Sequence, residues 1–280
     1  MKNIFCKYKK YKVLNAFNQP ILNIKIPNKK IAIWGLPRSG TSWLGQIFNS
    51  SVYTLYRFQP LFSYQFKNRI SLSSKDNDIE KLIIDVVNTD NKLIIDGIGP
   101  KKELNLLNFD KVQVPTHLVM KHVRYIHLID TFISRSENIK VIAIVRHPCA
   151  TINSWLRCKN EFLSKWDISE EWEYANKKNN NKDGEYFGFN KWKEGVEIFE
   201  KLASKYPNRF YLQHYSELLR DPFNEVRKLF QFSELKLCSQ VLKFIERSTS
   251  IQFEDDYSVF KCKKKTTIGS NNCHHLLLKK

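Results

Sequence analysis

Cysteine is sparse in this chain, and none of its six cysteines forms a C-x-x-C pair. Structural zinc sites and the disulfide frameworks of small secreted domains both need closely spaced or numerous thiols. The sequence therefore indicates neither, and we expect no metal and reduced thiols, as in the cytoplasm. The six positions are Cys6, Cys149, Cys158, Cys238, Cys262 and Cys273.

Long hydrophobic runs are also missing. No segment approaches the roughly 20 apolar residues that a membrane-spanning helix needs. Residues 1–12 mix apolar and basic side chains and lack the apolar core of a secretory signal. We expect a cytoplasmic protein without a membrane span, for which peripheral contact with a membrane surface stays open.

Acidic residues are too few to balance the basic ones, 28 against 46, so the formal net charge is +18. This charge would attract polyanions such as nucleic acids, anionic membranes or acidic polysaccharides. Lysine and asparagine are abundant throughout the chain, so the charge alone selects none of these partners. We expect no specific nucleic-acid partner, and the sequence carries no signal for an oligomeric state.

No linker rich in Pro, Gly or Ser divides the 280 residues, and 42% of them are apolar. We therefore expect a single domain over residues 1–260. Residues 261–280, which begin with a basic cluster at 261–265, are expected to form a poorly ordered tail.

Apolar periodicity predicts strands that alternate with helices. A continuous apolar run bounded by turn signals is typical of a buried strand, and strands alternating with helices indicate a mainly parallel sheet. The fold class is therefore α/β. The predicted strands cover 30–34, 117–121, 140–145 and 209–214, and the predicted helices cover 41–51, 78–88, 125–132, 150–157, 191–206 and 225–232.

The loop after the first strand has the glycine spacing G-x-x-x-x-G of a phosphate-binding P-loop, from Gly35 to Gly40. Backbone N–H groups and a helix N-terminus would surround an anion there. Thr41 follows Gly40 where a kinase or nucleoside triphosphatase has lysine, and the cation lies earlier, at Arg38. This difference argues against a P-loop kinase, as does the lack of an acidic residue after the strand 140–145.

A second candidate anion site follows that strand. Arg146 comes directly after residue 145, and Ser154 lies eight residues further on the next predicted helix. An arginine at the carboxyl end of a strand can hold a phosphate with two N–H groups, and a serine hydroxyl can add a third donor. Both candidate elements lie at strand ends, where open α/β sheets bind ligands.

Residues 37–43, Pro-Arg-Ser-Gly-Thr-Ser-Trp, closely resemble the 5'-phosphosulfate loop of the sulfotransferase superfamily, and Arg146 with Ser154 resembles its 3'-phosphate motif. Residues 211–222 are similar to the segment that places a tyrosine, here Tyr215, beside adenine. The resemblance spans residues 31–232 and implies a P-loop-type three-layer fold with 3'-phosphoadenosine 5'-phosphosulfate (PAPS) as co-substrate. It implies that PAPS is bound by Pro37, Arg38, Ser39, Gly40, Thr41, Ser42, Trp43, Arg146, Ser154 and Tyr215.

The late Arg-Lys-Gly loop of cytosolic small-molecule sulfotransferases is absent. The chain is thus closer to the carbohydrate and bacterial branch, and the implied acceptor is a hydroxyl on a glycan or glycolipid. Five aromatic residues are candidates for stacking on a sugar ring, although ordinary packing also explains them: Trp155, Trp166, Trp172, Tyr174 and Trp192. A non-catalytic binder of anionic polymers remains the alternative.

Sulfuryl transfer needs cations beside the leaving phosphate and a base for the acceptor proton. Arg38 supplies one cation, and Lys121 resembles a lysine beside the transferring group, unless it is an ordinary exposed lysine. His122 has a suitable pKa for the base, but strand alternation would point it away from Lys121. His147 is expected to shape the second phosphate site.

Residues 59–60 fall where many polysaccharide and tyrosylprotein sulfotransferases have Glu-Pro, and here the sequence is Gln-Pro. Gln59 cannot take a proton as a carboxylate does, although it can orient a hydroxyl. The base therefore stays open. Nearby, Arg57 either contacts an anionic acceptor or forms a surface salt bridge.

Overall fold

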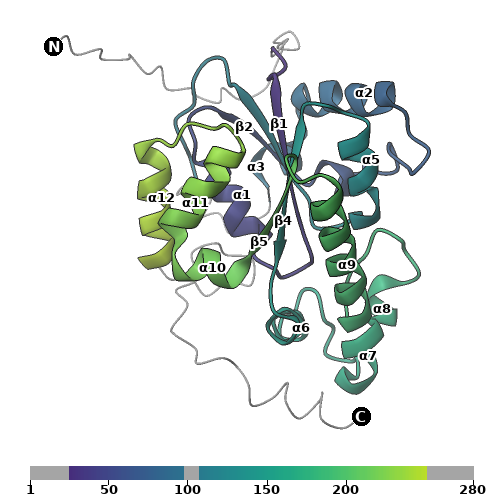
Figure 1. Ribbon diagram of the computed structural model, residues 1–280. Helices are drawn as coiled ribbons and strands as arrows, with labels where there is room; N and C mark the ends of the chain where they lie inside the picture. The colour runs from purple at the N-terminus through teal and green to yellow at the C-terminus, as the bar shows by residue number, and fades with distance from the viewer. Residues whose placement is uncertain (1–24, 98–106, 251–280) are drawn as a thin grey trace, which may run out of the picture.

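A five-stranded parallel sheet forms the centre of the molecule (Figure 1). The computed structural model describes residues 25–97 and 107–250. The strand order is β2-β3-β1-β4-β5, so β1 lies in the middle between β3 and β4. The strands are β1 (Lys29–Gly35), β2 (Thr54–Phe58), β3 (His117–Lys121), β4 (Ile139–Val145) and β5 (Phe210–His214).

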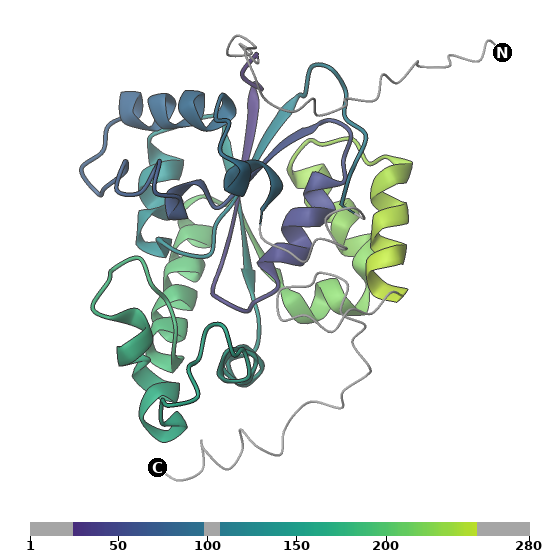
Figure 2. The ribbon, with the colours of Figure 1, turned by 180° about the vertical axis from the view of Figure 1, so that it is seen from behind.

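Helices cover both faces of this sheet. One layer contains α1, α10, α11 and α12, and the other contains α2, α5 and α9 (Figures 1 and 2). The predicted three-layer α/β fold is thereby confirmed. The helices are α1 (Thr41–Asn49), α2 (Asp76–Val87), α3 (Lys92–Asp96), α5 (Ile129–Ser134), α6 (Pro148–Leu156), α7 (Ile168–Tyr174), α8 (Asn176–Asn179), α9 (Phe189–Lys205), α10 (Tyr215–Arg220), α11 (Pro222–Phe232) and α12 (Ser239–Ser250), with short 3₁₀ turns at Pro60–Phe62 and Ile126–Leu128.

Alternation along β1 divides the core into two apolar clusters. Ile31 and Ile33 pack with α1 and the C-terminal helices, whereas Ala32 and Trp34 pack with α2, α5 and α9. Successive side chains of a strand point to opposite faces, so a strand covered on both sides must be apolar throughout. This explains the continuous apolar run that predicted β1.

Local features set where three of the helices begin. The helix expected at 125–132 starts as a 3₁₀ turn, because Tyr125 before it has a positive φ of 61°. Pro148 begins α6, a position that suits its fixed φ and missing N–H. Asp221 accepts a bond from the Asn224 N–H, and α11 therefore begins at Pro222.

All five strands run the same way, so their carboxyl ends share one edge of the sheet, which α6 covers in part (Figure 1). After β1 the chain forms β2 and β3 on one side of β1, and it later crosses to form β4 on the other side. Open α/β sheets bind ligands at the carboxyl ends of the strands where the chain changes side in this way. In the described segments no helix is both long and apolar enough to cross a membrane. The basic cluster at 261–265 and the expected tail lie outside the described residues, and the single domain over 1–260 stays a prediction.

Candidate functional site

The loop between β1 and α1 turns sharply at Arg38 and Gly40, which both have positive φ, 67° and 93°. The Ser39 N–H donates to the Leu36 carbonyl over 3.1 Å and closes the turn. Gly40 is the N-cap of α1 and provides no side-chain cap, and no acidic residue lies in the first turn. The N-terminus of α1 is therefore suited to an external anion.

Glycine is required at both ends of this loop. A Cβ on Gly35 would lie 2.4 Å from the Thr41 Cγ2, and one on Gly40 would lie 2.5 Å from the Tyr215 ring. Tyr215 begins α10, far along the chain, and its ring packs directly on the loop. The structure thus places Tyr215 beside residues 37–43.

The two anion motifs meet at Arg38. The Arg146 guanidinium donates from Nη1 to the Arg38 carbonyl over 3.1 Å, and Arg38 donates from Nε to the Ser154 hydroxyl over 3.2 Å. The carbonyl of Arg146 in turn accepts from Trp192 Nε1 at 3.0 Å and from the Thr151 hydroxyl at 3.2 Å. Residues more than 100 positions apart in the sequence thus form one site at the carboxyl edge of the sheet.

Electrostatics favour an anion between these cations. Burial lowers the pKa of Arg146, and the nearby charge of Arg38 lowers it further. The Arg146 guanidinium also lies 5.0 Å from the Tyr215 ring centroid. Two adjacent like charges are unfavourable unless a negative group joins them, and perturbed groups of this kind gather at functional sites.

The remaining loop residues support the same interpretation. Ser39 is fully buried, and its hydroxyl oxygen has no hydrogen-bond partner within the described part of the chain. Buried polar atoms are nearly always bonded, so an unpaired hydroxyl in an anion loop points to a ligand. Pro37 and Thr41 are buried, and Ser42 is half-buried. A phosphate or phosphosulfate group fits these donors.

Trp43 and His147 lie at the margins of the site. Trp43 donates from Nε1 to the Ser248 hydroxyl of α12 over 2.9 Å, and its ring meets the Tyr215 ring edge-on at 6.3 Å. Its buried ring packs in the cluster between α1 and α12. His147 precedes α6 and is exposed.

Lys121 lies on the α1 side of the sheet, against Gly45 of α1. Its side chain is only 1% exposed, and its ammonium nitrogen lies 4.5 Å from the centre of the Phe58 ring. Burial, with smaller effects from Arg124 and Arg38, lowers its pKa to about 7. Lys121 is therefore not an ordinary surface lysine.

His122 lies on the opposite face of the sheet from Lys121. Its N–H continues the ladder to the Ile33 carbonyl, so strand alternation still applies there. The ring stacks on Trp34 at 4.2 Å and is 2% exposed. Burial, and then the Lys121 charge, lowers its pKa to about 3. This position argues against His122 as the base, because the ring does not reach the side of the sheet that carries Lys121.

We expect His122→Phe to keep the transfer activity that the resemblance implies and to make the protein less sensitive to acid. In the unfolded chain histidine takes up a proton below its ordinary pKa of 6.5, whereas His122 in the folded protein does so only near 3. The wild type should therefore lose stability as the pH falls through this window, and Phe removes that loss while preserving the stack on Trp34. Chemical denaturation at pH 7 and pH 4.5 measures the difference. A folded variant that lost transfer more than about tenfold would restore His122 as the base.

Both interpretations of Arg57 from the sequence are wrong. Its side chain is buried, and it donates from Nε to the Val86 carbonyl at 2.8 Å and from Nη2 to the Val87 carbonyl at 2.7 Å. These carbonyls belong to the last turn of α2 and have no partner within the helix. Arg57 therefore caps α2 and takes no part in the site.

Gln59 lies at the site, directly after β2. Its N–H donates to the Lys121 carbonyl over 2.7 Å, and its φ is 43°. The side chain is 8% exposed, and its Oε1 has no partner among the described residues. Gln59 is thus held beside Lys121, where it could orient a hydroxyl but not remove its proton.

An ion pair that the sequence analysis missed lies at the same edge. Arg124 and Glu185 are joined at 2.7 Å and are almost buried. No spacing rule links residues 61 positions apart, and Glu185 follows a stretch rich in Lys and Asn that resembles an ordinary loop.

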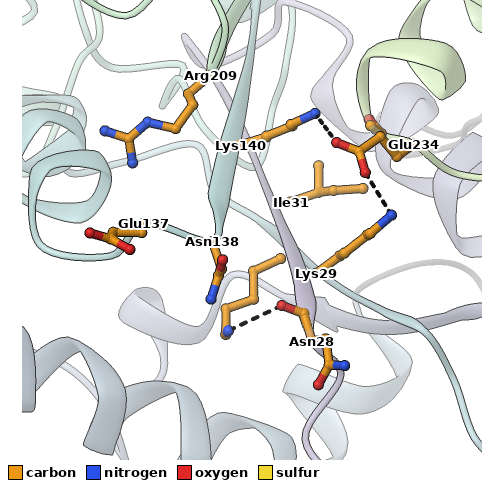
Figure 3. Close-up of a pocket in the computed structure, with 10 residues that line it drawn as sticks. Asn28, Lys29, Ile31, Glu137, Asn138, Lys140, Arg209 and Glu234 are labelled. Carbon is orange, nitrogen blue, oxygen red and sulfur yellow. Dashed lines mark hydrogen bonds and ion pairs between the residues drawn. The ribbon is translucent and has the colours of Figure 1, made fainter.

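A cavity opens at the other end of the sheet, at the amino ends of β1 and β4 (Figure 3). Glu234 binds Lys29 at 2.6 Å and Lys140 at 2.7 Å, and these bonds lower its pKa to about 2. Arg209 donates to the Ile133 and Ser136 carbonyls. The main cations of this cavity are already paired, so we interpret it as structural.

A parallel sheet with an anion loop after its central strand, and with a second guanidinium at the neighbouring strand end, defines a P-loop-type protein that binds a nucleotide through its phosphates. Residues 28–276 match the model of the sulfotransferase domain. The chain therefore belongs to the sulfotransferase family and is an enzyme of that family.

Solved structures of sulfotransferases are similar to this chain. A mouse sulfotransferase complexed with PAP is 15% identical, with 80% of this chain covering 65% of that one, and its TM-score is 0.44. The sulfotransferase domain of the Synechococcus olefin synthase is 17% identical over 92% of this chain and 86% of that one, with a TM-score of 0.45. The Mycobacterium tuberculosis enzyme STF1 is 13% identical over 80% and 72%, with a TM-score of 0.45. No curated protein sequence matches the chain, and its family membership rests on the family model.

Proposed function

We propose that this enzyme transfers the sulfuryl group of PAPS to a hydroxyl of a carbohydrate, on a glycan or a glycolipid. The observation that carries the proposal is the joining of the two motifs, in which Arg146 bonds to the Arg38 carbonyl and Arg38 bonds to Ser154. Separate sites for two phosphates, a fixed distance apart, suit a nucleotide with phosphates at both its 3' and 5' positions.

Each group has a distinct role in this proposal. The α1 N-terminus, with Arg38, Thr41 and Ser42, holds the 5'-phosphate that leaves, and Arg146 with Ser154 holds the 3'-phosphate. Lys121 offsets the charge that develops on the transferring group, and its burial strengthens that interaction. Tyr215 packs beside the loop, where the adenine would lie.

Aromatic rings near Arg146 support a sugar as the acceptor. Phe189 stacks on Trp192 at 6.2 Å and an interplanar angle of 7°, and Trp172 lies 6.0 Å from Phe189. All three rings are half-buried, and Trp192 is tied to the Arg146 carbonyl. Partly exposed aromatic faces suit the apolar faces of sugar rings. Trp155, in contrast, is 2% exposed inside a small core and cannot take this role.

A cytoplasmic location is part of the proposal. Cys149, Cys158 and Cys238, the cysteines that fall within the described residues, form no disulfide. Reduced thiols are typical of the cytosol.

We expect adenosine 3',5'-bisphosphate to raise the melting temperature of the protein and ATP to raise it much less. A ligand at 100 times its Kd stabilises the folded state by about 2.7 kcal/mol, which for a chain of this size is a rise of roughly 5–10 °C. Thermal melting with each nucleotide in excess makes the comparison. Stabilisation by ATP alone would contradict the proposal.

The acceptor is tested by transfer of radioactive sulfate from PAPS onto glycans, glycolipids and tyrosine peptides. Transfer to a glycan or glycolipid supports the carbohydrate proposal. Transfer only to tyrosine would replace it and leave PAPS as the donor.

A further inference from the structure

Glu185 is a nearly buried carboxylate with one oxygen unused. Its Oε1 accepts from Arg124 Nε at 2.7 Å, and the two side chains are 15% and 14% exposed. Its Oε2 is buried and has no hydrogen-bond partner within the described ranges. A carboxylate oxygen is a strong acceptor, and leaving it unpaired away from water is costly. Such an atom is poised for a donor that the protein itself does not supply.

Arg124 connects this carboxylate to the candidate site. It follows β3 by three residues, and its carbonyl accepts from Trp34 Nε1 at 2.9 Å, directly before the anion loop. Its guanidinium lies 4.1 Å from the centre of the Phe62 ring, just after Gln59. The charge of Arg124 contributes to the low pKa of Lys121. Arg124 and Glu185 therefore lie at the carboxyl edge, where the charge of Arg124 acts on Lys121.

The position of Glu185 is also well fixed. The N–H of Tyr125 donates to the Gly184 carbonyl over 3.0 Å, which ties the Glu185 loop to the loop after β3. A Cβ on Gly184 would lie 2.7 Å from the Tyr125 ring, so only glycine allows this close contact. Precise positioning is what a proton-transfer group requires.

Neither of the other groups considered as base suits the role. His122 is packed on Trp34, where burial lowers its pKa to about 3 and makes it a weak base, and Gln59 is an amide that cannot accept a proton near neutral pH. Of the other carboxylates in the region around α7 to α9, Glu161 is paired with Lys178 and Glu194 with Lys191. Among the carboxylates of that region that the structure describes, only Glu185 is paired with a cation whose charge lowers the pKa of Lys121.

We propose that Glu185 is the general base for the acceptor hydroxyl, an inference that rests on the proposed function. The acceptor oxygen forms a bond to sulfur while the bond from sulfur to the bridging phosphate oxygen breaks. The acceptor proton passes to Oε2 of Glu185, and the bonding electron pair leaves on the 5'-phosphate. Arg124 holds Oε1 and so aims Oε2 at the hydroxyl.

The reverse reaction tests this role without knowledge of the natural acceptor. Aryl sulfates can donate their sulfuryl group to adenosine 3',5'-bisphosphate, and the base of the forward reaction then acts as the acid that protonates the departing phenol. Phenyl sulfate needs that proton, whereas nitrophenolate leaves from 4-nitrophenyl sulfate without it. We expect Glu185→Gln to slow transfer from phenyl sulfate at least about 100-fold and transfer from 4-nitrophenyl sulfate less than about threefold.

Two further variants complete the experiment. Glu185→Asp keeps the carboxylate and should recover part of the rate with phenyl sulfate. Glu161→Gln, which alters another nearly buried, lysine-paired carboxylate, should change neither rate. If Glu185→Gln kept the wild-type rate with both donors, or slowed both transfers by the same factor, the proposal for Glu185 would be overturned. A wild-type protein inactive with both donors, and inactive with every acceptor in the assay of transfer from PAPS, would instead refute the proposed sulfuryl transfer.

Discussion

Arg146→Ala is expected to weaken binding of adenosine 3',5'-bisphosphate by about 10²–10³-fold, because truncating one partner of a buried charged pair costs about 2–5 kcal/mol. Arg146 is half-buried between the Arg38 carbonyl and the Tyr215 ring. Its guanidinium is therefore fixed before the ligand arrives, and little conformational entropy is lost on binding. Calorimetric titration of the bisphosphate onto each variant measures the effect.

A matched pair of variants separates charge from geometry. Arg146→Lys keeps the charge but loses the planar pair of donors, and we expect it to recover only a small part of the affinity. Arg157→Ala removes an exposed arginine at the end of the same helix, α6, and should change the affinity by less than about twofold. If Arg146→Ala bound the bisphosphate as tightly as Arg157→Ala, Arg146 would have no part in the phosphate site.

Sequence patterns predicted β1 and β4 because each contains a continuous apolar run, as strands covered on both faces must, and they also predicted β3 and β5, whose apolar segments are shorter. They missed β2, whose five residues include a charged one. The reason is Arg57, whose guanidinium binds the last carbonyls of α2 and so occupies the core. The residues next to Arg57 in the sequence do not reveal that its guanidinium will donate to carbonyls at the end of a helix about 30 residues away.

The sequence could indicate the parts of the candidate site that lie in one loop, but not the parts that depend on contacts between distant segments. The spacing from Gly35 to Gly40 predicted an anion loop, and strand alternation predicted that His122 would point away from Lys121. The bond from Arg146 to the Arg38 carbonyl required the sheet order, which places β4 beside β1. The pair of Arg124 and Glu185 depends on loop packing that no periodicity reveals.

Lys121→Met is expected to lower kcat by about 10²–10³-fold, the usual effect of losing one group that stabilises transition-state charge, and at the same time to stabilise the fold. A fully buried ammonium with a pKa near 7 is destabilised by its surroundings, and Met fills a similar volume without charge. Replacing a buried charge by an apolar side chain commonly gains about 1–4 kcal/mol. Loss of activity together with a higher melting temperature would identify Lys121 as a residue kept for function.

The pH dependence of that gain provides a second measurement. Below about pH 7 Lys121 is charged in both the folded and the unfolded chain, so the full penalty applies. Above this pH the folded form loses its proton first, and the penalty shrinks until the unfolded chain also titrates at its ordinary pKa of 10.5. The stabilisation by Lys121→Met should therefore be largest at pH 6–7 and decline toward pH 10, as urea denaturation at several pH values would measure.

Lys111→Met is the matched control, because Lys111 is also withdrawn from water and burial also lowers its pKa to about 7. Its ammonium, however, donates to the Ser51 carbonyl at 2.9 Å and the Thr54 hydroxyl at 3.2 Å, and also to the Asn49 carbonyl that ends α1. Removing these donors leaves carbonyls unpaired, so we expect destabilisation by about 1–3 kcal/mol with kcat nearly unchanged. If Lys121→Met raised the free energy of unfolding and Lys111→Met lowered it, the fold would not need the buried charge of Lys121. If both substitutions lowered it, Lys121 would be a structural residue.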